Sequence, residues 1–595
     1  MRLTSRLGSE PNAMKASVPK LFNCPGATKR LFTPSQEIGW LVSAVSRDRL
    51  KNLQHRGIAP SWSRKPPQTH QDFRLKRFGL RARLSAPAQD KTITPLSPLL
   101  ATCTPPGRSE GLLPLAKPIA RTTFQLEVTA MPTRFTEHSQ RFRPNSNEEQ
   151  VLQKAREHFE ATLIGVQGEL AGSVAAMEHR RADDALNYGE IFLRDNVPVM
   201  IYLMLEGRFA IVKQFLSVSL QLQSTNVQTR GVFPTSFVEE EGELVADYGQ
   251  RSIGRITSVD ASLWWPILCW IYVKRSGDID FGRSPEVQRG LQLLLDLVLH
   301  PSFEGTPVLF VPDCAFMIDR PMDVWGAPLE VEVLLFAALR SCVGLMELCQ
   351  RHENSVLLGE RLRLSRQWTH DLRQFLLKHY WVTSKTMQVL RRRPTEQYGE
   401  NQHHNEFNVQ PQVIPDWLQD WLENRGGYMI GNMRTGRPDF RFYSLGNSLA
   451  SLFGLLTAPQ QRALFRLVLH NRDHLMAQMP MRICHPPMEG VEWENKTGSD
   501  PKNWPWSYHN GGHWPSLLWF FCASILLHER LNPQADVLLM GQMKTLLDEC
   551  YWSHLNQLPR QQWAEYFDGP TGTWVGQQSR TYQTWTIVGF LLMHH

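Results

Sequence analysis

The sequence lacks the cysteine pattern of a disulfide framework or a zinc site. Its nine cysteines are an odd number, and no two of them have CxxC spacing. We therefore expect free thiols in a reducing compartment. The adjacent His403 and His404 have no third ligand at metal-binding spacing. The sequence thus predicts no metal site.

Other absences exclude further classes of protein. No apolar run reaches the roughly 18 residues that a membrane helix needs, so we expect no membrane contact. There is no GxSxG motif and no Cys/His nucleophile pattern, and the stretches GQRSIG and RGGYMIG are too loose for a phosphate-binding loop. Residues 131–595 hold 43 Lys and Arg against 50 Asp and Glu, and this mild acidity favours no nucleic-acid partner.

Residues 1–130 differ from the rest of the chain. They hold 21 Lys and Arg against 7 Asp and Glu, with scattered Pro and no sustained periodicity. This composition predicts a mostly disordered extension that takes no part in catalysis. Three interpretations stay open: an organelle transit peptide, a basic tail for an anionic partner, or an over-extended start ahead of Met131. We assign residues 131–595 to one catalytic domain.

That domain is predicted to be all-α. About a dozen segments have helical spacing of apolar residues, and several are apolar on every side. A helix of this kind must be buried all round. Alternation of such helices with amphipathic ones predicts two concentric rings, an (α/α) barrel, whose long loops build a site at one end. The best candidate for a strand is the segment 306–312, TPVLFVP.

Aromatic residues gather in the predicted loops. The chain has 19 Trp, and residues 499–515 read SDPKNWPWSYHNGGHWP. Aromatic rings suit the apolar faces of a sugar, and amides, His and carboxylates suit its hydroxyls. A buried turn with packed Trp is the alternative, because aromatic residues are first of all core residues. In the sugar interpretation, Gly511 and Gly512 let the backbone pass close to the ligand.

Two carboxylates are candidates for glycosidic-bond cleavage, which normally uses one protonated and one ionised carboxyl group. Asp260 lies in ITSVDASLWW, where it is either the N-cap of an apolar helix or a desolvated general acid with a raised pKa. Glu489 lies in HPPMEGVEW, close to Glu492 and Glu494. Each of these three is either a solvated loop acid or a general base, and composition does not choose among them.

Further charged residues lie in the same loops. Arg194 and Asp195 in FLRDN form either an internal ion pair or a clamp for hydroxyls, and the same holds for MIDRPMD, which contains Asp319, Arg320 and Asp323. Glu330 enters a helix that otherwise buries itself, so its carboxylate needs a partner such as Arg or a sugar.

From about Tyr188 to the C-terminus, the chain resembles the alkaline/neutral invertases of cyanobacteria and plants, glycoside hydrolase family 100. The resemblance rests on motifs that occur in order, among them FLRDNVP, GVFPTSF, GQRSIGRITSVDASLWW, CAFMIDRPM, FNVQPQVIPDW, RGGYMIGN, DFRFYSLGN, WSYHNGGHWP and SRTYQTW. It implies an (α/α)6 barrel, sucrose as the substrate, inversion at the glucosyl carbon and no cofactor. The family's general acid falls on Asp260 and its general base on Glu489.

The departures from the family pattern are modest. Pro266 stands inside the helix after LWW, where it is expected to kink the helix, and Asn196 follows FLRD in place of an aromatic-like residue. Residues of the matching motifs are expected to line a closed, polar pocket with Asp260 and Glu489: Asp195, Asp319, Glu330, Arg441, His509, Asn510, Trp514 and Gln583. For each of them, an internal ion pair or a helix cap is the alternative.

The sequence leaves several properties open. Another inverting glucosidase, acting on trehalose or maltose, is the alternative enzyme, and a sugar-binding protein without turnover is the alternative outside enzymes. We expect a cytoplasmic homo-oligomer, or a plastid or mitochondrial protein if residues 1–130 are a transit peptide.

Overall fold

The computed structural model describes residues 146–595, with gaps at 178–186, 252–254, 301–305, 351–355, 392–413, 423, 435–437, 535 and 575–578. The predictions for residues 1–130 and for His403 and His404 lie outside the described residues. No helix within the described ranges is long and apolar enough to cross a membrane.

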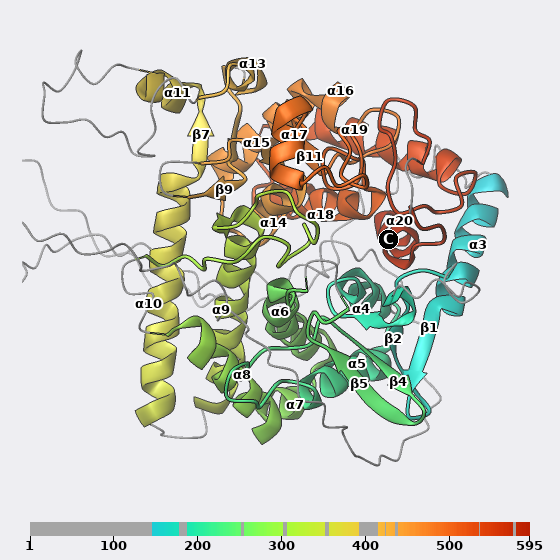
Figure 1. Ribbon diagram of the computed structural model, residues 1–595, viewed down its shortest axis with the longest axis vertical. Helices are drawn as coiled ribbons and strands as arrows, with labels where there is room; N and C mark the ends of the chain where they lie inside the picture. The colour runs from blue at the N-terminus through green and yellow to red at the C-terminus, as the bar shows by residue number, and fades with distance from the viewer. Residues whose placement is uncertain are drawn as a thin grey trace, which may run out of the picture.

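Six helices with mostly buried side chains form an inner ring in the described part of the chain. They have few charged residues, so the surrounding protein must cover them on every side. Each contacts the next, and the last returns to the first, which closes the ring (Figure 1). They are α4 (Asn196–Leu205), α6 (Val259–Ser276), α9 (Leu329–Gln350), α14 (Ser444–Leu452), α18 (Leu518–Leu531) and α20 (Thr584–His594).

A second set of helices surrounds this ring and alternates with the inner helices along the chain. These helices bury one face and expose the other, the pattern of an amphipathic surface helix. The alternation of inner and outer helices confirms the predicted (α/α)6 barrel. The outer helices are α3 (Ser146–Thr162), α5 (Phe209–Gln221), α8 (Pro285–Val298), α10 (Val356–His379), α15 (Ala458–His470) and α19 (Val537–Gln557).

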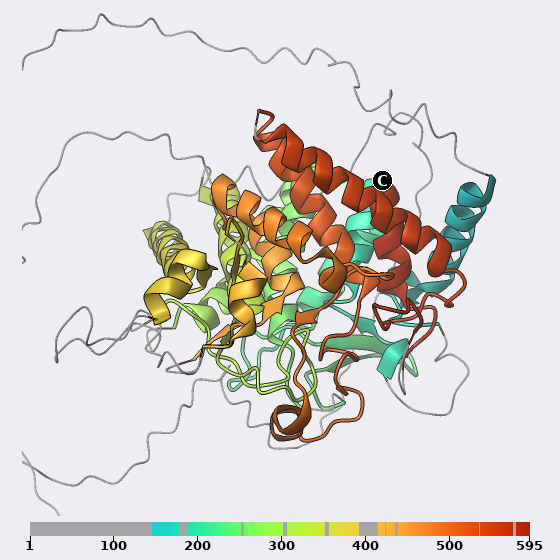
Figure 2. The ribbon, with the colours of Figure 1, turned by 90° about the horizontal axis from the view of Figure 1, so that it is seen from above.

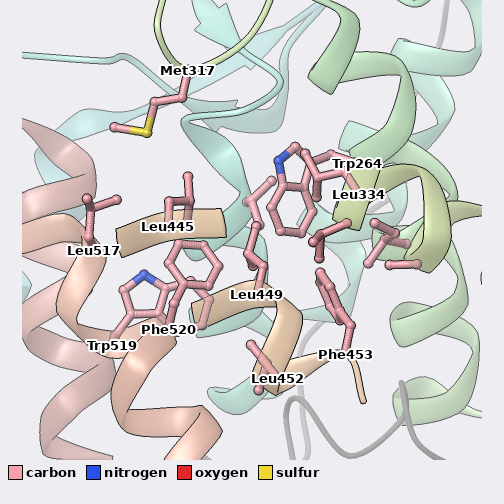
Figure 3. Close-up of a cluster of buried hydrophobic side chains, with 14 of the residues drawn as sticks. Trp264, Met317, Leu334, Leu445, Leu449, Leu452, Phe453, Leu517, Trp519 and Phe520 are labelled. Carbon is pink, nitrogen blue, oxygen red and sulfur yellow. The ribbon is translucent and has the colours of Figure 1, made fainter. Parts of the chain in front are cut away.

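Large apolar side chains fill the interior of the ring. The indole of Trp264 lies 6.0 Å from the ring of Phe453 and 6.1 Å from that of Phe520, between centroids. Figure 3 shows this cluster, with Met317 on one side of it. Met317 also lines the cavity described below. The packed cluster therefore closes the barrel below the cavity.

The strands are short and belong to the connecting segments. One sheet joins β3 (Ile191–Phe192), β4 (Ser236–Glu240) and β5 (Glu243–Asp247) in antiparallel order. Figure 2 shows the loops gathered at one side of the helices, together with the short helix α17 (Gly490–Thr497). The remaining antiparallel pairs are β1 (Leu163–Val166) with β2 (Glu169–Ser173), β6 (Ala327–Pro328) with β9 (Asn432–Met433), β7 (Trp381–Thr383) with β8 (Gly427–Met429), and β10 (Phe442–Tyr443) with β11 (Cys484–His485).

Short helices complete the described ranges. They are the 3-10 turns η3 (Asn187–Gly189) and η6 (Pro515–Leu517) and the α-helices α7 (Ile279–Arg283), α11 (Ser384–Arg391), α13 (Trp417–Leu422) and α16 (Arg472–Leu475).

Two local expectations differ from the structure. The segment 306–312 is not a strand: Val311 forms an isolated bridge with Gly326, and the amide of Leu309 donates to the carboxylate of Glu332 at 2.9 Å. The side chain of Glu332 thus accepts the hydrogen bond of a backbone amide that would otherwise donate to a neighbouring strand. The N-cap of helix α6 is Ser258, so Asp260 lies in the first turn and is not the cap, while Pro266 stands inside the helix.

Candidate functional site

A cavity lies among the loops at one end of the barrel. Both walls of the cavity come from segments far apart in the sequence, which the ring of helices brings together. Its lining combines rings with charged groups, as expected of a site for a ligand with apolar faces and polar edges. The lining includes Tyr188, Phe192, Arg194, Asp195, Ser258, Phe316, Met317, Asp319, Arg320, Lys502, Tyr508, His509, Trp514, Glu565 and Trp585.

Arg194 is the central cation of this site. It follows strand β3 and precedes α4, so its backbone is fixed at the mouth of an inner helix. Its Nη1 lies 3.1 Å from Oδ2 of Asp260, its Nη2 lies 3.6 Å from Oδ2 of Asp319, and its Nε lies 3.6 Å from Oδ1 of Asp195. Burial opposes the charge of Arg194, but the three carboxylates outweigh burial and raise the pKa of Arg194. The structure thus joins three predicted site residues through one guanidinium.

Asp260 is fully buried in the first turn of α6. Its Oδ1 accepts a hydrogen bond from the Ser258 hydroxyl, and its Oδ2 accepts one from Arg194. Asp260 is not among the cavity-lining residues, but Ser258 and Arg194 both are. The carboxyl group therefore lies one contact behind the cavity wall.

Two carboxyl groups near Arg194 have raised pKa values. Burial raises the pKa of Asp195 to about 7, although the charge of Arg194 opposes the shift. Burial raises the pKa of Glu330 to about 8, and the charge of Asp260 adds to that effect. Glu330 lines a small separate cavity with Phe316, which also lines the main one. Groups with such pKa values suit proton transfer at neutral pH.

Asp319 lines the cavity, with its side chain 39% exposed. The Tyr508 hydroxyl donates to its Oδ1 at 3.3 Å, and Nδ1 of His509 lies 3.7 Å from the same oxygen. His509 stacks on Trp514, with 5.2 Å between ring centroids. Burial lowers the pKa of His509 well below its usual value, so the ring is neutral.

The stretch 499–515 forms a tight loop whose aromatic side chains point in different directions. Trp506 and Tyr508 have positive φ angles of 69° and 43°, a conformation that residues other than Gly rarely adopt. A Cβ at Gly512 would lie 2.6 Å from the carbonyl oxygen of Tyr508, and Gly511 has a φ of 93°. The close approach at Gly512 is thus to the loop's own backbone, which differs from the expectation that it accommodates a ligand.

Asn510 holds this loop against the segment that carries Glu489. Its side-chain oxygen accepts from the amide of Met488 at 2.6 Å, and its amide group donates to the carbonyl of Met488 at 2.9 Å. The same amide group donates to the carbonyl of Asn503 at 3.1 Å. Asn510 is therefore placed to fix the loop and is not among the residues that line the cavity.

Glu489 is the N-cap residue of α17 and is exposed. Its Oε1 accepts a hydrogen bond of 2.6 Å from Nε1 of Trp506. Glu492, one turn later, has two cationic partners, Arg441 at 2.6 Å and Lys496 at 2.7 Å. Although burial opposes it, these cations lower the pKa of Glu492. Glu489 and Glu492 thus have different surroundings, which composition alone does not reveal.

The structure also places Arg441 and Gln583. Arg441 pairs with Asp439 and Glu492 and donates from Nε to the carbonyl of Pro486 at 3.1 Å. These contacts hold the segment before Glu489, and Arg441 is not among the cavity-lining residues. Gln583 is the N-cap residue of α20 and donates to Glu565 at 3.4 Å.

Glu565 and Lys502 line the cavity, but sequence reasoning does not find them. Nζ of Lys502 lies 3.6 Å from Oε2 of Glu565, and burial raises the pKa of that carboxyl. Lys502 belongs to the stretch DPKN within the aromatic-rich segment 499–515, and this position is the signal that the sequence offers for it. Glu565 lies in WAEYFDGP, a stretch without any signal of its own.

Several buried polar atoms at the site have no hydrogen-bond partner in the protein. A buried group of this kind normally has a partner, and a ligand rich in hydroxyls would supply it. Over the described residues, no group of three or more His, Cys, Asp and Glu side chains is arranged to hold a metal. The atoms without a hydrogen bond are Nε of Arg194, Oδ1 of Asp195, Oε1 of Glu330, Nδ1 of His509, Oε2 of Glu565 and Oε1 of Gln583. Three of them belong to the ion pairs of 3.6 Å described above, Arg194 with Asp195 and Lys502 with Glu565.

Residues 155–595 match the family model of the alkaline and neutral invertases. The chain belongs to this family. It is 36% identical to alkaline/neutral invertase CINV2 of Arabidopsis thaliana, covering 74% of this chain and 78% of the relative. It is 35% identical to neutral/alkaline invertase 1, mitochondrial, of Oryza sativa subsp. japonica, covering 92% and 86%. Membership confirms the resemblance and makes the protein a glycoside hydrolase.

Solved structures of other glycosidases resemble the chain more distantly. The GH63 mannosylglycerate hydrolase from Thermus thermophilus, in complex with glucose, is 13% identical with a TM-score of 0.44, over 75% of this chain and 99% of that one. A metal-independent alpha mannosidase from Streptococcus pneumoniae is 11% identical with a TM-score of 0.44, over 77% and 95%.

Proposed function

We propose that this invertase-family protein hydrolyses sucrose to glucose and fructose at neutral pH. The observation that carries the proposal is the set of three carboxylates, Asp195, Asp260 and Asp319, gathered on Arg194 at a cavity with aromatic walls. Such a set suits a sugar, because carboxylates accept hydrogen bonds from hydroxyl groups and aromatic rings cover the apolar face. The family relatives are named for this activity.

Asp260 is our candidate for the general acid. Its two oxygens contact Ser258 and Arg194, both of which line the cavity, so its carboxyl group lies directly behind the cavity wall. The charge of Asp260 adds to the burial that raises the pKa of Glu330 to about 8, so Glu330 holds a proton at neutral pH. We infer that Asp260 gives its own proton to the glycosidic oxygen as the glucosyl C–O bond breaks, and that this proton leaves with the fructose.

Glu489 is our candidate for the general base. It activates a water on the opposite face of the glucosyl ring, which inverts the configuration at the anomeric carbon. Its exposed carboxylate has the Trp506 indole as a hydrogen-bond donor, whereas Glu492 is neutralised by Arg441 and Lys496. Of these two acids, Glu489 is thus the freer to accept a proton from water.

The remaining pocket residues are assigned to sugar hydroxyls. Asp195, Asp319, His509 and Trp514 line the cavity, and Asp195 and His509 each carry a buried atom without a hydrogen bond. Gln583 and Glu330 carry such an atom as well, although neither is among the residues that line the cavity. We assign Arg441 and Asn510 to the support of the loop before Glu489, because their contacts lie within the protein.

The reaction is tested with purified protein and sucrose, followed by proton NMR. We expect glucose and fructose in equal amounts, with the glucose first released as the β-anomer, because sucrose carries an α-glucosyl bond and the mechanism inverts it. Asp260→Asn and Glu489→Gln are expected to lose turnover by about a hundredfold or more. Faster release of glucose from trehalose or maltose would overturn the substrate, and sucrose binding without products would overturn the activity.

Location and assembly remain predictions. Relatives are named cytosolic, mitochondrial and chloroplastic. We propose a cytoplasmic homo-oligomer, with a plastid or mitochondrion as the alternative location. A fluorescent fusion of the full chain tests the location, and sedimentation equilibrium tests the oligomeric state.

A further inference from the structure

A series of side-chain contacts connects two buried residues, His513 and Arg482, to Glu489 through Trp506. Arg482 is only 2% exposed, and its Nε donates to Nε2 of His513 at 3.0 Å. Nδ1 of the same imidazole contacts the carbonyl oxygen of Met479, which can only accept a hydrogen bond. The imidazole is therefore a neutral Nδ1–H tautomer, in agreement with the lowering of the pKa of His513 by burial. His513 fixes the plane of the Arg482 guanidinium.

The guanidinium of Arg482 lies over the indole of Trp506. Its central carbon is 4.5 Å from the ring centroid, within the range of a cation–π contact. A cation over the face of an indole withdraws electron density from the ring and makes its N–H a stronger donor. That N–H donates to Oε1 of Glu489 at 2.6 Å, a short distance typical of a hydrogen bond to a charged acceptor.

The backbone of Trp506 is shaped for this contact. Its φ of 69° costs conformational energy for any residue other than Gly, and such conformations persist where the surrounding structure enforces them. Here the amide of Trp506 donates to the carbonyl of Asn510 at 2.9 Å, and Asn510 holds the residue before Glu489. Both ends of the Trp506–Glu489 contact are thus fixed by the same asparagine.

We propose that Trp506, oriented and polarised by Arg482, is a positioning residue whose hydrogen bond holds the Glu489 carboxylate in place for its role as general base. The proposal rests on the proposed function, because it needs Glu489 as the base. Because the Arg482 guanidinium acts through the Trp506 indole, it strengthens the hydrogen bond to Glu489 without forming an ion pair with that carboxylate. Glu492, in contrast, forms an ion pair with Arg441.

Other charged groups on the surrounding elements have to be considered in a pH experiment. Three of these groups lie on α17: Glu492, Glu494 and Lys496. Arg441 lies immediately before β10. Arg482 and His485 lie at β11, and His474 lies on α16. Burial lowers the pKa of His485 to about 3, so this ring stays neutral across the working range. Glu492 is tied to two cations. Glu489 is therefore the group on this face that the loss of the indole N–H affects first.

The test compares Trp506→Phe with Trp504→Phe, the same change two residues earlier in the same loop. Trp504 is 58% exposed and packs edge-to-face on Trp493, so its replacement is expected to leave turnover unchanged. Trp506→Phe removes the N–H donor. We expect kcat to fall about ten- to a hundredfold, KM to stay within about twofold, and the acidic limb of the kcat/KM profile to move up by about half to one pH unit.

Benzothienylalanine at position 506, introduced by nonsense suppression, replaces the indole N–H with sulfur in a ring of the same shape. It is the second variant, in case Trp506→Phe loosens the loop, and the same changes are expected. Unchanged kcat and an unchanged acidic limb in both variants, with Glu489→Gln inactive, would overturn this inference alone. Full turnover in Glu489→Gln would instead show that Glu489 is not the general base, and would overturn that part of the proposed function.

Discussion

Nη1 of Arg194 lies 3.1 Å from Oδ2 of Asp260, although 66 residues separate the two in the sequence. The pair connects the mouths of two inner helices, α4 and α6. Both side chains are almost withdrawn from solvent, and Asp195 and Asp319 share the same guanidinium. Removal of the cation would leave buried carboxylates close together without compensation, which is strongly unfavourable.

Arg194→Met is therefore expected to lower the free energy of unfolding by about 3–5 kcal/mol and to abolish turnover. Denaturant unfolding followed by circular dichroism measures the first effect, and glucose release measures the second. Arg472→Met is the matched control, because the Arg472–Glu549 pair is about half exposed on both sides. There we expect a loss of about 0.2–1 kcal/mol and full activity. Equal effects in the two variants would contradict the assignment.

Glu330 is expected to make stability depend on pH. Its pKa is about 8 in the folded protein, against an ordinary value of 4.5. Between these values the folded state holds a proton that the unfolded state has lost. The stabilising contribution is thus fully present below about pH 4.5 and is lost as the pH rises through about 8, by at most about 1.4 kcal/mol per pH unit.

Glu330→Gln is expected to flatten this part of the stability profile. Relative to the unchanged protein, the free energy of unfolding of the variant should rise at pH 9, and this gain should be smallest at pH 5. Urea unfolding at a series of pH values measures the slope. Asp195→Asn is expected to act in the same direction over a lower window, because the pKa of Asp195 is about 7. Identical slopes in Glu330→Gln and the unchanged protein would show that the carboxyl is ionised throughout.

Asn510→Ala is expected to reduce kcat more than it changes KM. The substitution removes three hydrogen bonds that hold Met488 and Asn503, and leaves buried backbone groups without partners. We expect a stability loss of about 1–3 kcal/mol and a misplaced Glu489. Asn556→Ala is the control, because Asn556 is exposed and bonds only within its own helix turn, to Trp552. A rise in KM at constant kcat would indicate instead that Asn510 binds sugar.

The sequence is sufficient to predict the barrel, because several inner helices are apolar on every side and alternate with amphipathic helices along the chain. The site is predictable only in part. Asp195, Asp319, His509 and Trp514 line the cavity, and all four lie in motif-bearing segments between the helices. Asp319 and Tyr508 are 189 residues apart, and no local pattern reveals that their side chains meet.

The differences between the expected and the observed lining of the cavity have physical causes. Arg441 lies in a motif of the right kind, but its charge is used by Asp439 and Glu492, and the sequence cannot assign partners to charges. Glu565 escapes sequence reasoning, because a single acid among aromatic residues has no distinctive pattern. Only its burial beside Lys502 and Gln583 reveals it.

The three acids of the loop 489–494 are expected to differ when each is changed to its amide. Glu489→Gln should lose turnover by about a hundredfold or more, because an amide cannot accept the proton from water. Glu492→Gln should lose much less, since its carboxylate is occupied by Arg441 and Lys496 and acts on the loop, not on the substrate. Glu494 is exposed on α17, so Glu494→Gln is the matched control, with turnover unchanged. Added azide, a small anionic nucleophile, is expected to restore turnover in Glu489→Gln alone and to form β-glucosyl azide, which mass spectrometry detects. Loss of turnover in Glu492→Gln together with rescue of that variant by azide would move the base to Glu492.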